Sequence, residues 1–221
     1  MKIKTLVAAL ALSMFASAAS SLEFRIGISG AWTDFDATGT ETVKSSSATN
    51  TTDDVGDSVF IPTGLIEVGT DGGWTVGIDY VDAEQIGAES STRPDTDVDD
   101  SSDTSGTNSA SADLDKHITY YISKTLGENL YVKAGFSQAD VLTTENLATG
   151  TTYGDVTVDG KMFAVGMQGR SSNNWMLRLE YAITDYDDIT ITGSADADSV
   201  SNKVDAELDS KAFKIQIVKA F

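Results

Sequence analysis

Residues 213–221 (FKIQIVKAF) decide the fold class of this chain. They alternate between an apolar and a polar face, which is the period of a β-strand. The apolar face carries Phe213, Ile215, Ile217 and Phe221, and the polar face carries Lys214, Gln216 and Ala220. Because terminal residues usually fray, a chain that closes on such a strand needs a partner for it. We therefore expect this strand to pair with the first one and to close a β-barrel without open edges.

The other end of the sequence predicts export. Lys2 and Lys4 precede an apolar run over residues 6–15, and small residues at 16–19 offer a cleavage site. These features form a secretory signal peptide, which we place at residues 1–19. The alternative is an N-terminal membrane anchor, but the apolar run is shorter than the roughly 20 residues that a spanning helix needs. We expect residues 20–221 to form a single β-barrel domain.

Composition narrows the classes of function. The 221 residues include no Cys, so neither a disulfide nor a thiolate metal site is available. The formal net charge is −19, and 27 of the 34 acidic residues lie in four segments, at 36–57, 82–116, 138–160 and 185–210. Such a chain would repel nucleic-acid phosphates, so we expect no nucleic-acid partner. The acidic segments would instead gather cations.

Two kinds of connector alternate along the mature sequence. Residues 70–73, 126–129 and 169–174 are short and contain the Gly and Asn that hairpin turns require. The four acidic segments are long and polar. Long and short connectors alternate strictly, so seven connectors join eight strands. The expected strands cover residues 22–32, 60–68, 74–80, 117–123, 130–136, 163–168, 175–184 and 213–221.

Each expected strand has one apolar face and one polar face, which is the pattern of a transmembrane barrel. A soluble β-sandwich or lipocalin-like barrel has the same period, but a sandwich has connectors of less regular length. We therefore predict an all-β fold, an eight-stranded antiparallel up-and-down transmembrane barrel with three short periplasmic turns and four long extracellular loops. Aromatic residues near the strand ends predict interfacial girdles. The predicted membrane-interface anchors are Phe24, Trp32, Trp74, Tyr80, Trp175 and Phe221.

The signal peptide, the eight amphipathic strands, the alternating connectors and the terminal Phe221 together resemble the small outer-membrane barrels. The most similar types are the transmembrane domain of outer membrane protein A and the outer membrane protein W and X types. The resemblance implies a location in the cell outer membrane, contact with lipid and lipopolysaccharide, and recognition of the last strand by the barrel assembly machinery. Lys219 departs from the pattern, because an aromatic or apolar residue is usual there. We expect its side chain to reach the periplasmic interface, and we expect a monomer.

Eight charged residues fall on the inward faces of the expected strands. An eight-stranded barrel is only wide enough to be filled by side chains, so these charges need partners of opposite sign. The predicted lumen charge network is Glu23, Arg25, Glu67, Asp79, Lys133, Arg178, Glu180 and Lys214. Two interpretations stay open. One is a packed polar plug that does not conduct, and the other is a gated, narrow ion path whose salt bridges exchange partners.

The function we expect is a structural or surface-interaction role, with a narrow porin-like path for ions or small solutes as a further use of the barrel. One alternative is an enzyme that modifies lipid or peptide, which would need His117 with Asp113 or Asp115. A single His at a strand start is more often a hydrogen-bonded structural residue, so we expect no catalytic residues.

The other alternative is a binding module that uses the acidic loops for cations or for host or phage surfaces. Carboxylates suit Ca²⁺, but their spacing here matches no EF-hand loop, so no metal site or cofactor is expected. The loop acids concerned are Asp97, Asp99, Asp100, Asp103, Asp196 and Asp198.

Overall fold

The fold is seen in a computed structural model that describes residues 22–42, 51–82, 84–93, 106–146, 152–194 and 203–221. The predicted signal peptide lies outside these ranges, and so do the six loop acids of the predicted cation module. Among the described residues, no helix is long and apolar enough to cross a membrane.

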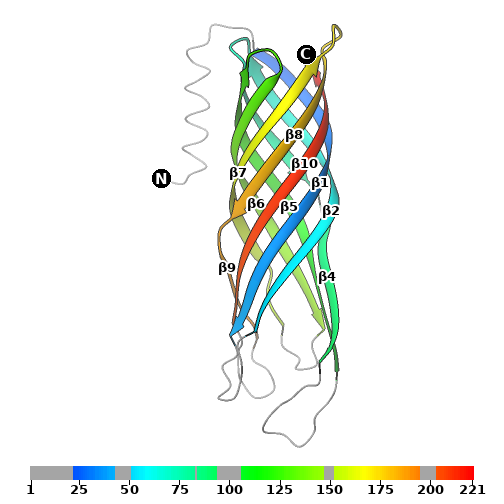
Figure 1. Ribbon diagram of the computed structural model, residues 1–221, viewed down its shortest axis with the longest axis vertical. Helices are drawn as coiled ribbons and strands as arrows, with labels where there is room; N and C mark the ends of the chain where they lie inside the picture. Colours follow the sequence, from blue (N-terminus) through cyan, green and yellow to red (C-terminus); the bar gives the residue numbers. More distant parts are fainter. Residues whose placement is uncertain (1–21, 43–50, 83, 94–105, 147–151, 195–202) are drawn as a thin grey trace, which may run out of the picture.

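The chain forms one closed, antiparallel eight-stranded barrel (Figure 1). The ten strands occupy eight positions in the barrel wall, because two positions are each shared by two consecutive strands. β3 and β4 both pair with β5, and β8 and β9 both pair with β10. The strands are β1 (Leu22–Thr42), β2 (Thr51–Thr70), β3 (Trp74–Val81), β4 (Glu84–Arg93), β5 (Gly106–Leu126), β6 (Leu130–Asn146), β7 (Val156–Arg170), β8 (Trp175–Tyr186), β9 (Ile189–Thr192) and β10 (Lys203–Ala220).

The first and last strands close the barrel, as the C-terminal pattern predicted. β1 pairs with β10 in an unbroken antiparallel register from Arg25↔Ala220 to Thr42↔Lys203. In Figure 1 the two strands run side by side along the wall. The backbone N–H of Phe221 adds a bond to the carbonyl of Phe24, 2.9 Å long, so the terminal residue is held as well.

The three short turns gather at one end of the barrel, together with the C-terminus (Figure 1), and we name this the turn end. The opposite end, where the long connections begin, is the loop end. Gly73 and Gly127 have φ of 74° and 67°, and Asn174 has φ of 62°, so each turn contains a residue in the left-handed region. The third turn is shorter than predicted, because Gly169 and Arg170 still belong to β7.

The prediction of long loops was wrong in extent. Much of each acidic segment is strand: β1 continues to Thr42, β2 already begins at Thr51, and β10 begins at Lys203. The physical reason is a change in the polarity of the wall. Beyond Trp32 the outward side chains become acidic and the inward ones apolar. The strand therefore keeps its period of two, but the polar face is now outside and the apolar face inside.

Candidate functional site: the barrel interior

A band of exposed apolar side chains surrounds the turn-end half of the barrel. The predicted anchors all lie on this outer surface, with Phe24, Trp32, Trp74, Tyr80, Trp175 and Phe221 between 41 and 69% exposed. At one boundary of the band Trp32 packs edge-on against Phe60, with ring centroids 5.2 Å apart. At the other, Phe24 lies 6.4 Å from Phe221. Large apolar side chains exposed in this number require a lipid environment.

The interior of the same half holds an ionic layer, formed by the eight residues of the predicted lumen network. Its centre is Glu67, which is 1% exposed. Arg178 donates to both of its carboxylate oxygens, at 2.6 and 2.9 Å, and the hydroxyl of Tyr121 donates to Oε1 at 2.8 Å. Arg25 approaches the same carboxylate at 3.7 Å. One buried acid is thereby matched by two guanidinium groups, as its burial demands.

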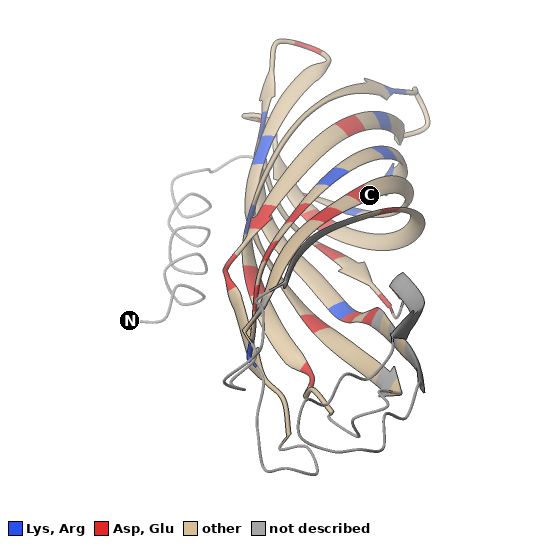
Figure 2. Cartoon of the chain, turned by 60° about the horizontal axis from the view of Figure 1, so that its bottom comes forward, with Lys and Arg blue, Asp and Glu red and all other residues tan. Residues whose placement is uncertain are grey.

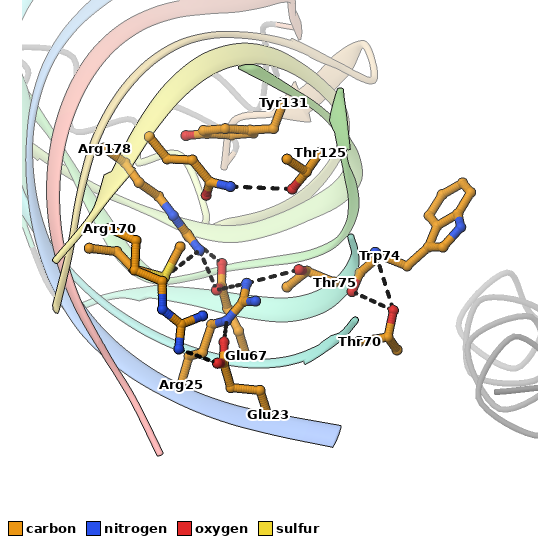
Figure 3. Close-up of polar contacts among 12 residues, drawn as sticks. Glu23, Arg25, Glu67, Thr70, Trp74, Thr75, Thr125, Tyr131, Arg170 and Arg178 are labelled. Carbon is orange, nitrogen blue, oxygen red and sulfur yellow. Dashed lines mark hydrogen bonds and ion pairs between the residues drawn. The ribbon is translucent and has the colours of Figure 1, made fainter. Parts of the chain in front are cut away.

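Toward the turn end the network reaches the rim. Arg25 donates to Glu23 at 2.6 Å and to the hydroxyl of Thr75 at 3.1 Å. Arg170, which was not predicted as a member, binds the other oxygen of Glu23. Figure 3 shows this chain of contacts running from Arg170 through Glu23 and Arg25 to the Glu67–Arg178 pair inside the barrel.

Toward the loop end the network continues through two lysines. Lys133, which is 1% exposed, lies 2.7 Å from Glu180 and 3.7 Å from Asp79. Lys214 lies 3.4 Å from Asp79 and 3.8 Å from Glu180, so the two acids share two cations. The hydroxyl of Tyr131 donates to Glu180 at 2.9 Å. The eight predicted residues therefore form two groups of ion pairs, one around Glu67 and one around Glu180, and two tyrosines connect the groups.

Two tyrosines belong to the ionic layer and were missed at the sequence level. Tyr121 also lies under the ammonium of Lys133, with its ring centroid 4.0 Å from Nζ. Tyr131 likewise faces Arg178 at 5.7 Å. The sequence offered one indication of these two tyrosines, namely inward glycines that leave room for a large ring. The register pairs Gly77 with Tyr121 and Gly166 with Tyr131. Only the register shows that these residues face each other.

Beyond the ionic layer the interior turns apolar. Ten buried side chains from eight strands form one packed cluster, which we name the apolar layer. Its members are Ala31, Phe35, Ile61, Val81, Leu114, Ala139, Val141, Val158, Tyr186 and Leu208. Between the two layers lie small and hydroxyl-bearing residues, among them Thr119 and Ser137, whose hydroxyl groups are 2.8 Å apart.

The sequence pattern that corresponds to the apolar layer is a set of triplets in which a central residue with an apolar or aromatic side chain lies between two acidic residues. They are Asp34-Phe35-Asp36, Asp113-Leu114-Asp115, Asp185-Tyr186-Asp187 and Glu207-Leu208-Asp209. In each triplet the central side chain is buried inside the barrel, and the flanking acids are partly or fully exposed. All of these acids except Asp34 lie in segments that we assigned to loops, and most of them instead form part of the outer wall beyond the apolar band. Figure 2 shows acidic positions along the strands toward the loop end.

His117 lies at the boundary of the two layers, beside a β-bulge in β5. Its Nε2 is 3.4 Å from the hydroxyl of Tyr186. Asp113 and Asp115 flank the buried Leu114, and Asp115 pairs with Lys116 at 2.9 Å. The described contacts therefore join His117 to a tyrosine rather than to these acids, which favours a structural role for the histidine.

The wall around the apolar layer has an unpaired stretch. β2 pairs with β3 from Gly69 up to Gly64↔Tyr80, and within the described residues its remaining part, from Thr51 to Thr63, pairs only with β1. β4 faces that part of β2, and in the part of the chain that the structure describes it pairs only with β5. Pro62 lies at this stretch and has no N–H to donate. We name the break between β2 and β4 the seam.

The outer wall at the loop end carries separate ion pairs. Lys211 lies 2.8 Å from Asp36 and Lys203 lies 2.8 Å from Asp205. The hydrogen bond from Lys203 holds the pKa of the Asp205 carboxyl below its usual value. Among the residues that the structure describes, no group of three or more His or acidic side chains is arranged to hold a metal ion.

Comparison with known proteins gives a family and a fold. The sequence profile of the outer membrane protein beta-barrel domain family matches residues 5–215. No curated protein matches the chain. Among solved structures, outer membrane protein OprG from Pseudomonas aeruginosa is 11% identical with a TM-score of 0.55, over 91% of this chain and 97% of that one. This likeness supports the barrel fold.

Two further structures resemble the chain less closely. Outer membrane protein AlkL, solved in lipid bilayers, is 13% identical with a TM-score of 0.48 and 93% coverage of both chains. The attachment invasion locus protein Ail of Yersinia pestis, solved with a heparin analogue, is 10% identical with a TM-score of 0.40. That match covers 88% of this chain and 99% of Ail.

Proposed function

Since the chain belongs to the outer membrane protein beta-barrel domain family, we propose that it admits small apolar solutes from the cell exterior into the outer membrane. In such barrels the short turns face the periplasm and the long connections face outward. The apolar layer then lies on the extracellular side, and the ionic layer lies within the membrane.

The observation that carries the proposal is the change of the interior from apolar to ionic along the barrel axis. An apolar solute that enters from outside loses water and gains contacts with Phe35, Leu114 and Tyr186, at about 25 cal/mol per Å² of buried apolar surface. The ionic layer offers it no such gain. Its salt bridges also cross the lumen between strands that are not neighbours, such as β2 to β8 and β3 to β10, and we infer that they block the axis.

The seam supplies a sideways exit. Moving two paired strands apart would break backbone hydrogen bonds, each costly to lose away from water. β2 and β4 share no such bonds along the described part of the seam, so separating them carries no such cost. The inward residues of β2 at this height, Val59 and Ile61, belong to or pack on the apolar layer. A solute that displaces side chains of the apolar layer would therefore lie directly behind the unpaired stretch.

The test is solute entry into vesicles. Proteoliposomes that contain lipopolysaccharide and the folded barrel would be mixed with N-phenyl-1-naphthylamine, whose fluorescence rises in an apolar environment. We expect faster entry than into protein-free vesicles, slower entry with Phe35→Asp, and unchanged entry with the matched Phe35→Leu. Equal rates with and without the barrel would overturn the proposal.

A second candidate function is interaction with partners at the cell surface. The extension of the barrel wall beyond the apolar band favours this function. The β1–β10 pairing continues ten residues beyond Trp32, to Thr42, so the barrel rises well past the apolar band. The outward acids there present a negative surface that suits cationic partners. Binding of polylysine to vesicles bearing the barrel, lost when Asp34 and Asp36 are replaced by Asn, would support this role. Binding that is unchanged by the substitutions would oppose it.

The third use, a gated ion path along the axis, depends on the ionic layer. It would need Arg178 and Lys133 to exchange their carboxylate partners, Glu67 and Glu180, so that the axis opens. Recording in planar bilayers separates this use from the first, because apolar solute entry requires no current. Conductance steps that change with Lys133→Gln would favour the ion path. A barrel without current at any voltage or salt would exclude it.

A further inference from the structure

The same pair of side chains, a tryptophan and a lysine, occurs at two places on the turn end, and we name each of these places a Trp–Lys corner. Trp74 and Trp175 each begin the strand after a short turn, and the register places a lysine directly opposite each of them, Lys124 and Lys219. Lys124 Nζ lies 4.9 Å from the centroid of the Trp74 ring. Lys219 Nζ lies 5.4 Å from the centroid of the Trp175 ring. Both distances are within the range of a cation–π contact.

The hydrogen bonds of the two lysines match as well. Lys124 donates to the carbonyl of Gly72 in the first turn. Lys219 donates to the carbonyl of Asn173 in the third turn, at 2.6 Å. An ammonium group has three donors, and each lysine gives one of them to the protein. The repeated geometry at two unrelated hairpins indicates one common use.

The lysines at the loop end differ in their partners. Lys116, Lys161 and Lys211 are the first outward residues beyond the apolar band on their strands, and each pairs with an acid. Their partners are Asp115, Asp187 and Asp36, at 2.9, 3.7 and 2.8 Å. The ion pairs of the described residues include neither Lys124 nor Lys219. The two turn-end lysines therefore keep N–H donors that no ion pair with a described carboxylate takes up.

The position of Lys124 and Lys219 along the membrane normal determines which chemical groups surround their ammonium groups. The tryptophans beside them are 41 and 51% exposed on the outer surface, at the boundary of the apolar band. Figure 3 shows Trp74 projecting away from the barrel wall, with Thr70, the last residue of β2, close to its backbone. Tryptophan prefers the headgroup level of a membrane. The ammonium groups thus lie among the headgroups of the periplasmic leaflet, where phosphodiesters are the abundant anions.

We propose that each Trp–Lys corner binds the phosphate of an anionic glycerophospholipid in the periplasmic leaflet. The ammonium donates its two remaining N–H groups to the phosphate oxygens, and the indole covers the glycerol and upper acyl chain. The proposal gives Lys219 a role where a small barrel usually carries an apolar residue. It depends only on membrane insertion and is separate from the passage of apolar solutes.

The experiment counts the lipids that stay with the folded barrel. Nanodiscs of phosphatidylcholine with a minor fraction of phosphatidylglycerol would hold the barrel, and native mass spectrometry would measure the retained lipids. We expect phosphatidylglycerol to be enriched over its share in the disc, with up to two molecules held. The enrichment should fall about fivefold for each of Lys124→Gln and Lys219→Gln, which is the magnitude typical of one lysine at an anionic membrane surface.

Two control variants make the outcome decisive. Lys161→Gln with Lys211→Gln removes two outward lysines that are already paired, and it should leave the enrichment unchanged. Lys124→Arg with Lys219→Arg keeps the charge and should preserve it. Heat-modifiable migration on a gel verifies folding of every variant. Wild-type barrel without enrichment over phosphatidylcholine would overturn the proposal even if the variants fail to fold. A Lys124→Gln, Lys219→Gln double variant that keeps full enrichment would also overturn it.

Discussion

Arg178 on β8 holds Glu67 on β2 across the lumen through two hydrogen bonds, of 2.6 and 2.9 Å, and both side chains are at most 3% exposed. The two residues are 111 positions apart in the sequence. A bidentate guanidinium–carboxylate pair of this kind fixes the relative orientation of the strands that carry it. The strength of the pair depends on both partners staying in place, because either charge alone would be buried without compensation.

Arg178→Ala should destabilise the folded barrel by about 3–5 kcal/mol, since it leaves the buried Glu67 carboxylate with Arg25, at 3.7 Å, as its one described ion-pair partner. Urea unfolding in detergent micelles, followed by gel migration, would measure the loss. Arg170→Ala removes a cation at the exposed rim and should cost about 1 kcal/mol or less. Similar losses in the two variants would contradict the central place of the Glu67–Arg178 pair.

Gly77→Ala should destabilise the barrel by about 1–3 kcal/mol through overpacking. A Cβ at this position would lie 2.5 Å from the Tyr121 ring and 2.6 Å from its hydroxyl, which donates to Glu67. Gly64→Ala is the matched control, because a Cβ there meets no atom within 4 Å. The same unfolding measurement applies, and a larger loss for Gly64→Ala would show that Tyr121 is not held as described.

Leu114→Ala should cost about 2–5 kcal/mol, because it opens a cavity in the apolar layer where the side chain is 1% exposed. Leu177→Ala, which shortens a side chain that is 55% exposed on the outer surface, should cost less. Chemical unfolding of both variants in the same lipid would rank them. If Leu177→Ala were the more damaging change, the apolar layer would not be a packed core.

Gly127→Ala should destabilise the second turn by about 1–2 kcal/mol through backbone strain alone. Its φ is 67°, and a Cβ there would meet no atom within 4 Å, so no clash contributes. Gly169→Ala is a control with the same open space and without a positive φ. Refolding yields into lipid vesicles would compare the two variants, and an equal effect would argue against the left-handed turn.

The amino-acid sequence by itself determined the barrel. Its period-2 faces, the alternation of short and long connectors and the closing strand at 213–221 are local features, and each follows from how a strand presents its side chains. The same alternation marked the inward charges and the outward aromatic anchors, because a residue's face depends only on its position in the strand. Local pattern also placed the Gly and Asn residues that turn the chain.

Only the tertiary structure decided which residues meet. The register of eight strands sets Arg178 against Glu67, Tyr121 against Gly77 and Lys219 against Trp175, and a shift by two residues would preserve every face while changing every one of these pairs. It also showed that acids flanking Phe35 or Leu114 belong to wall strands. Residue polarity alone led us to assign such acids to loops. It cannot distinguish the two cases, because water outside the membrane solvates an acidic side chain equally well on a strand and on a loop.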